Sequence, residues 1–272
     1  MVPPQDLSTA PDFALRLEQA EAAAWLDLEP ALAGSRPIET QEIDGATVIL
    51  DRSTDWPHSR IFNLGFQRPA TAQTLERILD AIRAAGITTI ATDVSPVARP
   101  GHVPRILTSA GFHYTDSNVV VARHTGEMPE PDSYFRLRIA AADDTDAAIQ
   151  LMQQVMPAGP DWTVTLAGQI ARPRWRIYLA TENGVVCGLG GIHINEDFAW
   201  LSPSWVLPDH RNRGTQAALI AHAVRDAAAS GIEWVTTSYP ATVPGRTRNF
   251  ERLGFSMVYQ RRHFVWQAPP SQ

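Results

Sequence analysis

Residues 206–219 decide how the second half of the chain is interpreted, and their sequence is Val206-Leu207-Pro208-Asp209-His210-Arg211-Asn212-Arg213-Gly214-Thr215-Gln216-Ala217-Ala218-Leu219. A predicted strand, Phe198 to Val206, comes before them, and a helical pattern from Thr215 to Ser230 follows. The start of a helix presents unpaired backbone N–H groups and the positive end of the helix dipole, and phosphate binds there readily. Gly214 lets the backbone approach a phosphate closely, while Arg211 and Arg213 add positive charge. The stretch therefore predicts a phosphate-binding junction between a strand and a helix.

The elements around this junction predict an α/β (α+β) fold. Asn183-Gly184 separates two apolar runs and is a strong signal for a β-hairpin. Beyond the helix, Ile232 to Thr237 is predicted to be a strand, Arg246 to Leu253 a helix, and Phe255 to Trp266 the last strand or pair of strands. We expect a central twisted mixed sheet flanked by helices.

The N-terminal half contains landmarks that recur in the C-terminal half. Gly86 and Gly231 each end a predicted helix and lie 145 positions apart (231 minus 86). The Gly-Phe pairs that begin at Gly111 and Gly254 lie 143 positions apart (254 minus 111). Nearly equal offsets predict a duplicated unit. A polar linker rich in proline around residues 125–132 separates the copies, which predicts two domains at 1–126 and 133–272.

The composition limits the classes of function. The chain has 272 residues, is 44% hydrophobic and carries a formal net charge of -6, which argues against wholesale binding to nucleic acid or to an anionic membrane. It has no apolar run of the roughly 18 residues that a membrane span needs. Its one cysteine, Cys187, excludes a disulfide within the chain, and no metal site is predicted. We expect a cytoplasmic protein, and the sequence leaves open whether it forms a homodimer.

The motifs resemble those of a known enzyme family. Arg211-x-x-Gly214-x-Gln216-Ala217, preceded by Val206-x-Pro208, is similar to the cofactor motif of the GNAT acetyltransferase superfamily, although Gln216 stands where glycine or alanine is usual. Phe250-Glu251-Arg252-Leu253-Gly254-Phe255 resembles the signature near the family's C-terminus. The resemblance covers about half of the chain, from Phe135 to Trp266.

The resemblance implies two GNAT-like domains and acetyl-CoA as the cofactor. The N-terminal copy is degenerate, because Gln67-Arg68-Pro69-Ala70 lacks the motif, and we expect it to bind no cofactor. In the C-terminal copy the resemblance implies a set of cofactor-binding residues, namely Trp205, Val206, Arg211, Asn212, Arg213, Gly214, Thr215, Gln216, Ala217, Asn249, Phe250 and Arg252.

The resemblance also implies direct attack of a small amine on the thioester, whose carbonyl a backbone N–H near Val206 would polarise. The fourth strand of many relatives carries a carboxylate where Trp200 stands here, and the late helix carries a tyrosine where Phe250 stands. The candidates for moving protons are therefore Ser204, His193 and Tyr239. For His193 the ordinary alternative is a half-exposed residue at a strand end, and for Tyr239 it is packing at the mouth of the cleft.

Three functions remain open at this stage. The first is an acetyl-CoA-dependent N-acetyltransferase for a small amine, bound between the two halves or over the segment from Pro157 to Arg174. The second is a catalytically weak protein that binds CoA or another ligand. The third is acyl or aminoacyl transfer from a different donor. Aromatic side chains suit an aromatic acceptor, but Trp200 and Trp205 should lie on opposite faces of one strand, so only one of them should face it.

Overall fold

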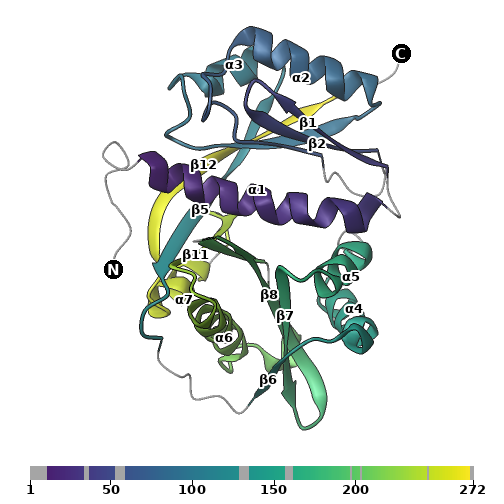
Figure 1. Cartoon of the computed structure of the whole chain (residues 1–272), viewed down its shortest axis with the longest axis vertical. Helices are drawn as coiled ribbons and strands as arrows, with labels where there is room; N and C mark the ends of the chain where they lie inside the picture. The colour runs from purple at the N-terminus through teal and green to yellow at the C-terminus, as the bar shows by residue number, and fades with distance from the viewer. Residues whose placement is uncertain are drawn as a thin grey trace.

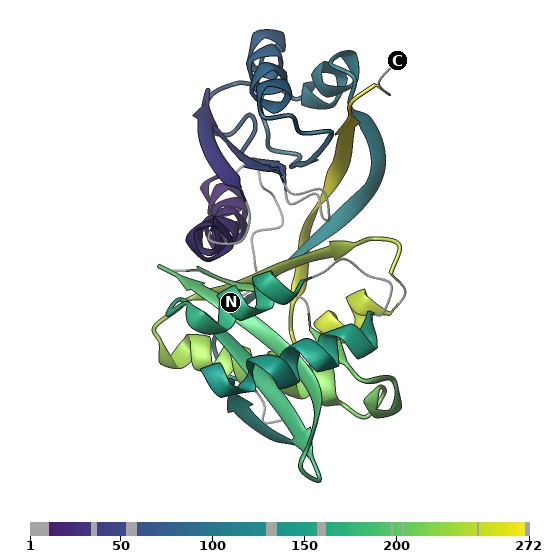
Figure 2. The same ribbon diagram turned by 90° about the vertical axis from the view of Figure 1, so that its right-hand side faces the viewer.

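The computed structural model describes residues 11–33, 37–52, 59–128, 135–156, 162–196, 198–202, 204–243 and 245–269. Twelve strands form one twisted mixed sheet, in the order β1-β2-β3-β4-β12-β5-β11-β9-β8-β7-β6 with β10 paired to β8, and helices cover it (Figures 1 and 2). Pairs β3–β4 and β9–β11 are parallel and the others are antiparallel. The predicted class, a mixed sheet flanked by helices, is confirmed.

The elements of the N-terminal half are α1 (Pro11–Ala33), β1 (Ile38–Ile43), β2 (Ala46–Asp51), β3 (Arg60–Phe62), α2 (Ala72–Ala84), β4 (Thr89–Val94), α3 (Val103–Ser109) and β5 (His113–His124). Those of the C-terminal half are β6 (Arg136–Ile139), a 3-10 turn (Ala142–Asp144), α4 (Thr145–Val155), α5 (Thr163–Ala171), β7 (Trp175–Glu182), β8 (Val185–Asn195), β9 (Phe198–Leu201), β10 (Trp205–Val206), a second 3-10 turn (Pro208–His210), α6 (Thr215–Ala229), β11 (Trp234–Pro240), α7 (Arg246–Arg252) and β12 (Ser256–Gln267). The described helices include none that is both long and apolar enough to cross a bilayer.

Two tight turns set the register of two hairpins. Asn183 and Gly184 both have positive φ (52° and 83°), as a type I′ turn requires, and they join β7 to β8 as predicted. Asp44 and Gly45 have nearly the same angles (52° and 84°) and join β1 to β2. The strand β1 was missed by the sequence interpretation, although Asp-Gly is as strong a hairpin signal as Asn-Gly.

The two halves exchange their last strands. Each half contains the series helix, strand, helix, strand: α2-β4-α3-β5 in the first and α6-β11-α7-β12 in the second. In the sheet, β12 lies between β4 and β5, and β5 lies between β12 and β11. Each final strand therefore pairs with the penultimate strand of the other half. The predicted boundaries, 1–126 and 133–272, follow the chain, whereas the sheet interleaves the two segments. Residues 129–132 of the predicted linker lie outside the described part.

Helix α1 lies between the two halves (Figure 1). It contributes Ala14, Leu17 and Leu28 to a buried cluster with α4, α5 and β7–β9, so a helix of the N-terminal half covers one face of the C-terminal part of the sheet. Helices α6 and α7 cover the opposite face. Helix α2 packs on the other end of the sheet through an apolar stripe formed by Leu75, Ile78, Leu79 and Ile82, which are all at most 5% exposed.

The strand predicted from Phe198 to Val206 is interrupted. β9 ends at Leu201, β10 begins at Trp205, and Pro203 between them lies outside the described residues. The parallel pairing of β9 with β11 stops at Trp200 and Thr236, while β11 continues to Pro240 and β10 pairs only with β8. The sheet therefore splays open between β10 and the end of β11.

Candidate active site

Helix α6 begins with an open N-terminus. Its N-cap, Gly214, has φ 84° and supplies no side-chain hydrogen bond to the first turn. A Cβ at Gly214 would have no heavy atom within 4 Å, so the space in front of the helix is free. The unpaired N–H groups of the first turn thus face a site that an anion can enter.

A hollow of about 600 Å³, here called the outer hollow, lies in front of this helix start. It is lined by ten of the twelve predicted cofactor-binding residues: Trp205, Val206, Arg211, Asn212, Gly214, Thr215, Gln216, Ala217, Asn249 and Arg252. Two arginines that the sequence interpretation did not single out, Arg246 and Arg248 of α7, also line it. No described lining residue is acidic, so the hollow concentrates positive charge.

The side chain of Arg213 is directed elsewhere. Its guanidinium donates to both carboxylate oxygens of Glu182, at 2.9 Å for the Nη1 contact, and Glu182 also contacts His210 at 2.8 Å. Arg213 does not line the outer hollow, so the positive charge expected from it is supplied by Arg246 and Arg248. In the sequence, Gly245 could have pointed to these two arginines, because it directly precedes the helix that carries them. In the structure Gly245 is the N-cap of α7 with φ 78°, just as Gly214 is the N-cap of α6.

Gln216, the residue that departs from the family motif, connects three elements. Its Nε2 donates to Oγ of Ser204 at 2.8 Å, and its Oε1 accepts from Nδ2 of Asn249 at 2.8 Å. The first turn of α6 is therefore fixed to the residue before β10 and to α7. Because the Ser204 oxygen accepts this bond, its own hydrogen remains available to another acceptor.

A second hollow of about 60 Å³, the middle hollow, fills the splay of the sheet. Ser204 and Gln216 line both it and the outer hollow, and Ser202, Tyr239 and Phe250 also line it. Tyr239 and Phe250 are stacked, with ring centroids 5.3 Å apart and planes within 4° of parallel. The Tyr239 hydroxyl donates to Oγ1 of Thr247 at 3.1 Å. A phenol is therefore present one ring layer from Phe250, where the family signature has its tyrosine.

A third space, the inner cavity, has a volume of about 340 Å³ and lies between α1, α5 and the sheet. Trp200, Ser238 and Tyr239 line both the middle hollow and the inner cavity. Trp200 and Trp205 both line the inner cavity, so the expectation that only one would face it is wrong. The break between β9 and β10 is the reason, because it removes the strict alternation that an unbroken strand would impose.

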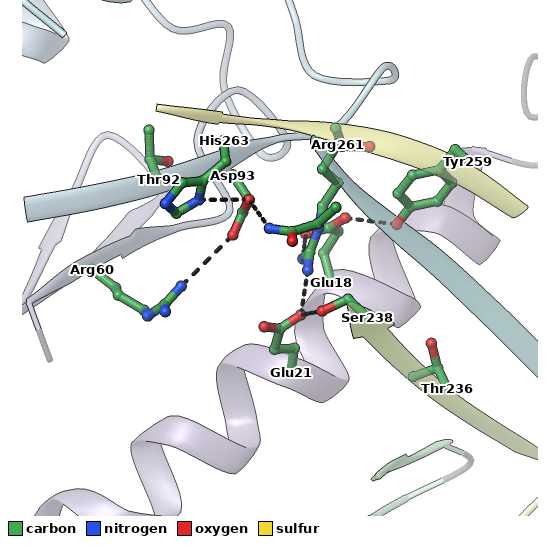
Figure 3. Close-up of polar contacts among 12 residues, drawn as sticks. Glu18, Glu21, Arg60, Thr92, Asp93, Thr236, Ser238, Tyr259, Arg261 and His263 are labelled. Carbon is green, nitrogen blue, oxygen red and sulfur yellow. Dashed lines mark hydrogen bonds and ion pairs between the residues drawn. The ribbon is translucent and has the colours of Figure 1, made fainter. Parts of the chain in front are cut away.

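Charged residues from both halves meet at one wall of the inner cavity (Figure 3). Arg261 of β12 is 2% exposed and donates to Glu18 at 2.9 Å and to Glu21 at 2.7 Å, both on α1. The hydroxyl of Tyr259 donates to Glu18 at 2.6 Å, and that of Ser238 to Glu21 at 3.4 Å. Of these residues Glu21 and Ser238 line the cavity.

Asp93 of β4 continues this cluster. It contacts Nδ1 of His263 at 3.0 Å, accepts from Asn118 at 2.7 Å and lies 3.7 Å from Arg60. Burial alone would raise the pKa of Asp93, but Arg261, His263 and Arg60 outweigh it and hold that pKa well below its ordinary value. Asp93 is therefore ionised at neutral pH, and it keeps His263 oriented at the cavity wall.

His193 lies away from these spaces. It is fully buried, which corrects the expectation of a half-exposed residue, and it packs against Trp175 with ring centroids 5.2 Å apart. Burial, helped by Arg174 and Arg172 and opposed by Asp27 at 3.7 Å, lowers the pKa of His193 to about 4. It lines none of the three spaces, so the structure does not bring this candidate to Ser204 and Tyr239.

The corresponding helix start in the N-terminal half is closed by its own chain. The N-cap of α2, Thr71, accepts from the N–H of Thr74 at 3.1 Å in a capping box. The hydroxyl of Thr74 donates to Asp44 at 3.0 Å, which places a carboxylate beside the helix start. An anion there would meet a satisfied N–H group and a negative charge, the opposite of the arrangement at α6.

The described residues include no group of three or more His, Cys, Asp or Glu side chains placed to hold a metal ion. Cys187 is buried and donates to the carbonyl of Ala180 at 3.3 Å, as a structural thiol does.

Comparison with known proteins agrees with this geometry. Residues 145–255 match the model of the acetyltransferase (GNAT) family. Among solved structures, the fold is similar to that of a GCN5-related N-acetyltransferase from Kribbella flavida (TM-score 0.70, 18% identity, covering 93% of this chain and 95% of that one). It is also similar to that of a GCN5-related N-acetyltransferase from Sphaerobacter thermophilus (TM-score 0.62, 14% identity, covering 84% of this chain and 82% of that one). A third similar structure is that of a tandem GNAT protein from the clavulanic acid biosynthesis pathway (TM-score 0.61, 14% identity, covering 84% of this chain and 80% of that one).

A search of curated proteins returned no match. The structural similarities extend over both halves of the chain, and at these identities they establish the fold alone. The family match spans α4 to α7 and includes the open start of α6. Residues 145–255 therefore form a domain that matches the GNAT acetyltransferase family, and this domain makes the chain an acyltransferase.

Proposed function

We propose that the chain transfers the acetyl group of acetyl-CoA to a small amine by direct attack. The observation that carries this proposal is that the outer hollow, the middle hollow and the inner cavity are in series and share side chains at each boundary. A nucleotide-bearing cofactor needs an anion site, a narrow path for its arm and a reaction point that opens onto a second substrate, in that order.

The pyrophosphate of CoA would bind at the start of α6, where Gly214 leaves space and Arg211, Arg246 and Arg252 supply charge. The pantetheine arm would follow the splay between β10 and β11, where the backbone edges lack strand partners. When bound, acetyl-CoA supplies the activated acyl group. The N–H near Val206 would polarise its carbonyl.

Two side chains are proposed to move protons or charge at this point. The Ser204 hydroxyl, oriented by Gln216, can donate toward the thioester end of the middle hollow. Tyr239 lies where the middle hollow meets the inner cavity, and its phenol would protonate the leaving thiolate in place of the missing tyrosine at position 250. His193 is not proposed, because burial keeps it neutral and away from the three spaces.

The N-terminal half, residues 1–126, is proposed to serve the acceptor and not a second cofactor. Its α2 start is closed by Thr71 and Asp44, whereas its α1, β4 and β5 supply one wall of the inner cavity. Residues 157–161 of the segment that was the alternative acceptor region lie outside the described part of the chain.

Amine-dependent release of free CoA thiol tests the proposal. We expect release that requires both acetyl-CoA and amine, with an acetylated amine as the product. Binding of acetyl-CoA without any turnover across primary amines would favour the second candidate, a CoA-binding protein, for which Phe250 and Trp200 at the two usual catalytic positions are the specific observations.

A further inference from the structure

We infer that the inner cavity binds an arylalkylamine, that is, a primary amine on a short chain joined to a flat aromatic ring that carries a hydrogen-bonding substituent. The inference rests on the proposed function, since this amine would be the acetyl acceptor. A volume of about 340 Å³ is at the small end of ligand sites and suits a single-ring compound.

A carboxylate at one wall is available to an ammonium group. Three carboxylates line the cavity, and two of them are paired: Glu21 with Arg261 at 2.7 Å, and Asp93 with His263 at 3.0 Å. Asp116 instead accepts from the backbone N–H of Ser117 at 2.7 Å and from the hydroxyl of Thr242 at 3.1 Å. Across the described part of the chain, no basic side chain lies within ion-pair distance of Asp116. A carboxylate beside an apolar cavity that has no cationic partner favours a cationic ligand.

Asp116 lies on β5 two residues before Asn118, so the two side chains are on the same face of that strand. On β5, Asn118 is paired with Pro240 and Val119 with Tyr239 in the register with β11. Tyr239 and Ser238 are the side chains that line both the inner cavity and the middle hollow. An ammonium bound at Asp116 would therefore lie near the end of β11, where Tyr239 borders both the inner cavity and the middle hollow.

The other walls are aromatic. Five tryptophans line the cavity: Trp25, Trp162, Trp175, Trp200 and Trp205. Trp25 and Trp162 have ring centroids 6.4 Å apart, and Trp175 and Trp200 are perpendicular at 6.1 Å. Flat indole faces and edges at several orientations pack best against another flat ring, whereas a flexible aliphatic chain would fill this space poorly.

One buried amide gives the ring a polar neighbour. Gln169 of α5 lines the cavity and is only 7% exposed. No described residue makes a hydrogen bond with its side chain. A buried amide requires a hydrogen-bonding partner, and a hydroxyl on the ligand ring would supply one that acts as both donor and acceptor.

Calorimetry with the whole chain, with and without CoA, tests the three features by removing them one at a time. Tyramine carries all three, 2-phenylethylamine lacks the hydroxyl, 2-(4-hydroxyphenyl)ethanol lacks the amine, and 1,5-diaminopentane lacks the ring. We expect tyramine to bind most tightly, with 2-phenylethylamine weaker by roughly 3- to 10-fold and the other two weaker by about tenfold or more. Equal or tighter binding of the alcohol or of the diamine would overturn the inference, as would absence of binding by all four at millimolar concentration.

Two variants assign the features to residues. Asp116→Asn should weaken tyramine by about tenfold or more and leave the neutral alcohol unchanged, because only the charge contact is lost. Gln169→Leu should lower the affinity for tyramine to that for 2-phenylethylamine, and the affinity for 2-phenylethylamine should not change. Asp80→Asn, whose side chain is 75% exposed on α2, is the matched control and should change neither ligand. Equal weakening of the amine and the alcohol in Asp116→Asn would contradict the assigned role.

The proposed function and the assignment of the acceptor class can be contradicted separately. Tyramine binding with no acetyl transfer would count against the proposed function and leave the cavity assignment intact. Acetyl transfer to 1,5-diaminopentane and not to tyramine would keep the proposed function and overturn the acceptor class.

Discussion

The Nε2 of Gln216 donates a 2.8 Å hydrogen bond to the Oγ of Ser204, and this contact fixes the start of α6 to the edge of the sheet where the strands separate. Glycine or alanine, the residues usual at this motif position, would leave Ser204 without that donor. Ser204→Ala should lower kcat by about tenfold while the KM for acetyl-CoA changes little, because the hydroxyl and not the phosphate site is removed. Ser109→Ala on the exposed end of α3 is the control, and a tenfold rise in KM at unchanged kcat would assign Ser204 to cofactor binding instead.

The stacked pair Tyr239 and Phe250 gives a second prediction. Tyr239→Phe should reduce kcat by at least about tenfold, since general-acid assistance to a leaving group is typically worth 10²–10⁴. Adding Phe250→Tyr to that variant should recover part of the loss, because a phenol returns one ring layer away. Steady-state kinetics of the single and double variants measure this. Tyr114→Phe, at a residue 55% exposed, should be neutral. Unchanged kcat in Tyr239→Phe would remove Tyr239 from the mechanism.

Arg261 joins the two halves through Glu18 and Glu21 (Figure 3). Arg261→Met would leave both carboxylates buried without a cation, so the free energy of unfolding should fall by about 3–5 kcal/mol. Urea titration measures the change. The neighbouring Arg262→Met is exposed and should stay within about 0.5 kcal/mol of wild type. A loss no larger than that control would show that the network contributes little to joining the halves.

His193 predicts a specific pH dependence of stability. Its pKa in the folded chain is about 4, lowered by burial from an ordinary 6.5, so the unfolded chain takes up this proton first as pH falls. The contribution of neutral His193 to the free energy of unfolding is therefore fully present above pH 6.5 and is lost as the pH falls from about 6.5 to 4. This contribution is on the order of 3 kcal/mol. In His193→Leu the unfolding free energy should vary less over this window, whereas exposed His102→Gln should leave the variation unchanged. An identical pH profile in His193→Leu would contradict the buried neutral histidine.

Features that depend on residues close together in the sequence, such as turns, helix ends and the start of α6, could be predicted from local signals. Gly214 and the residues around it belong to one strand–helix junction, and the hollow in front of α6 collects ten of the predicted side chains. The paired landmarks Gly86 and Gly231 both have positive φ just after a helix end, as the repeat implied. Phe250 lacks the tyrosine hydroxyl of the family signature, and this absence made Tyr239 a candidate; in the structure the two rings are stacked.

The remaining features depend on residues that are far apart along the chain. The exchange of β5 and β12 has no local signal, because either strand could pair within its own half. The burial of His193 is completed in part by α1, where Asp27 lies 166 positions earlier (193 minus 27). The charged wall of the inner cavity combines residues of α1, β4, β5 and β12, which no single stretch of sequence brings together. The break between β9 and β10, in contrast, has a local signal, because the sequence Ser202-Pro203-Ser204 separates the apolar residues and proline cannot donate a backbone hydrogen bond.

Thermal unfolding with and without acetyl-CoA tests most directly whether acetyl-CoA binds at the start of α6. Gly214→Glu places a Cβ and a negative charge at the phosphate site, while Gly231→Glu places the same residue just beyond the opposite end of the same helix, at a similar φ of 78°. Acetyl-CoA at 100 times its Kd should stabilise wild type by about 2.7 kcal/mol, a rise in Tm of roughly 5–10 °C. We expect this rise in wild type and Gly231→Glu and its loss in Gly214→Glu; no rise in wild type, or an equal rise in all three proteins, would contradict binding at this site.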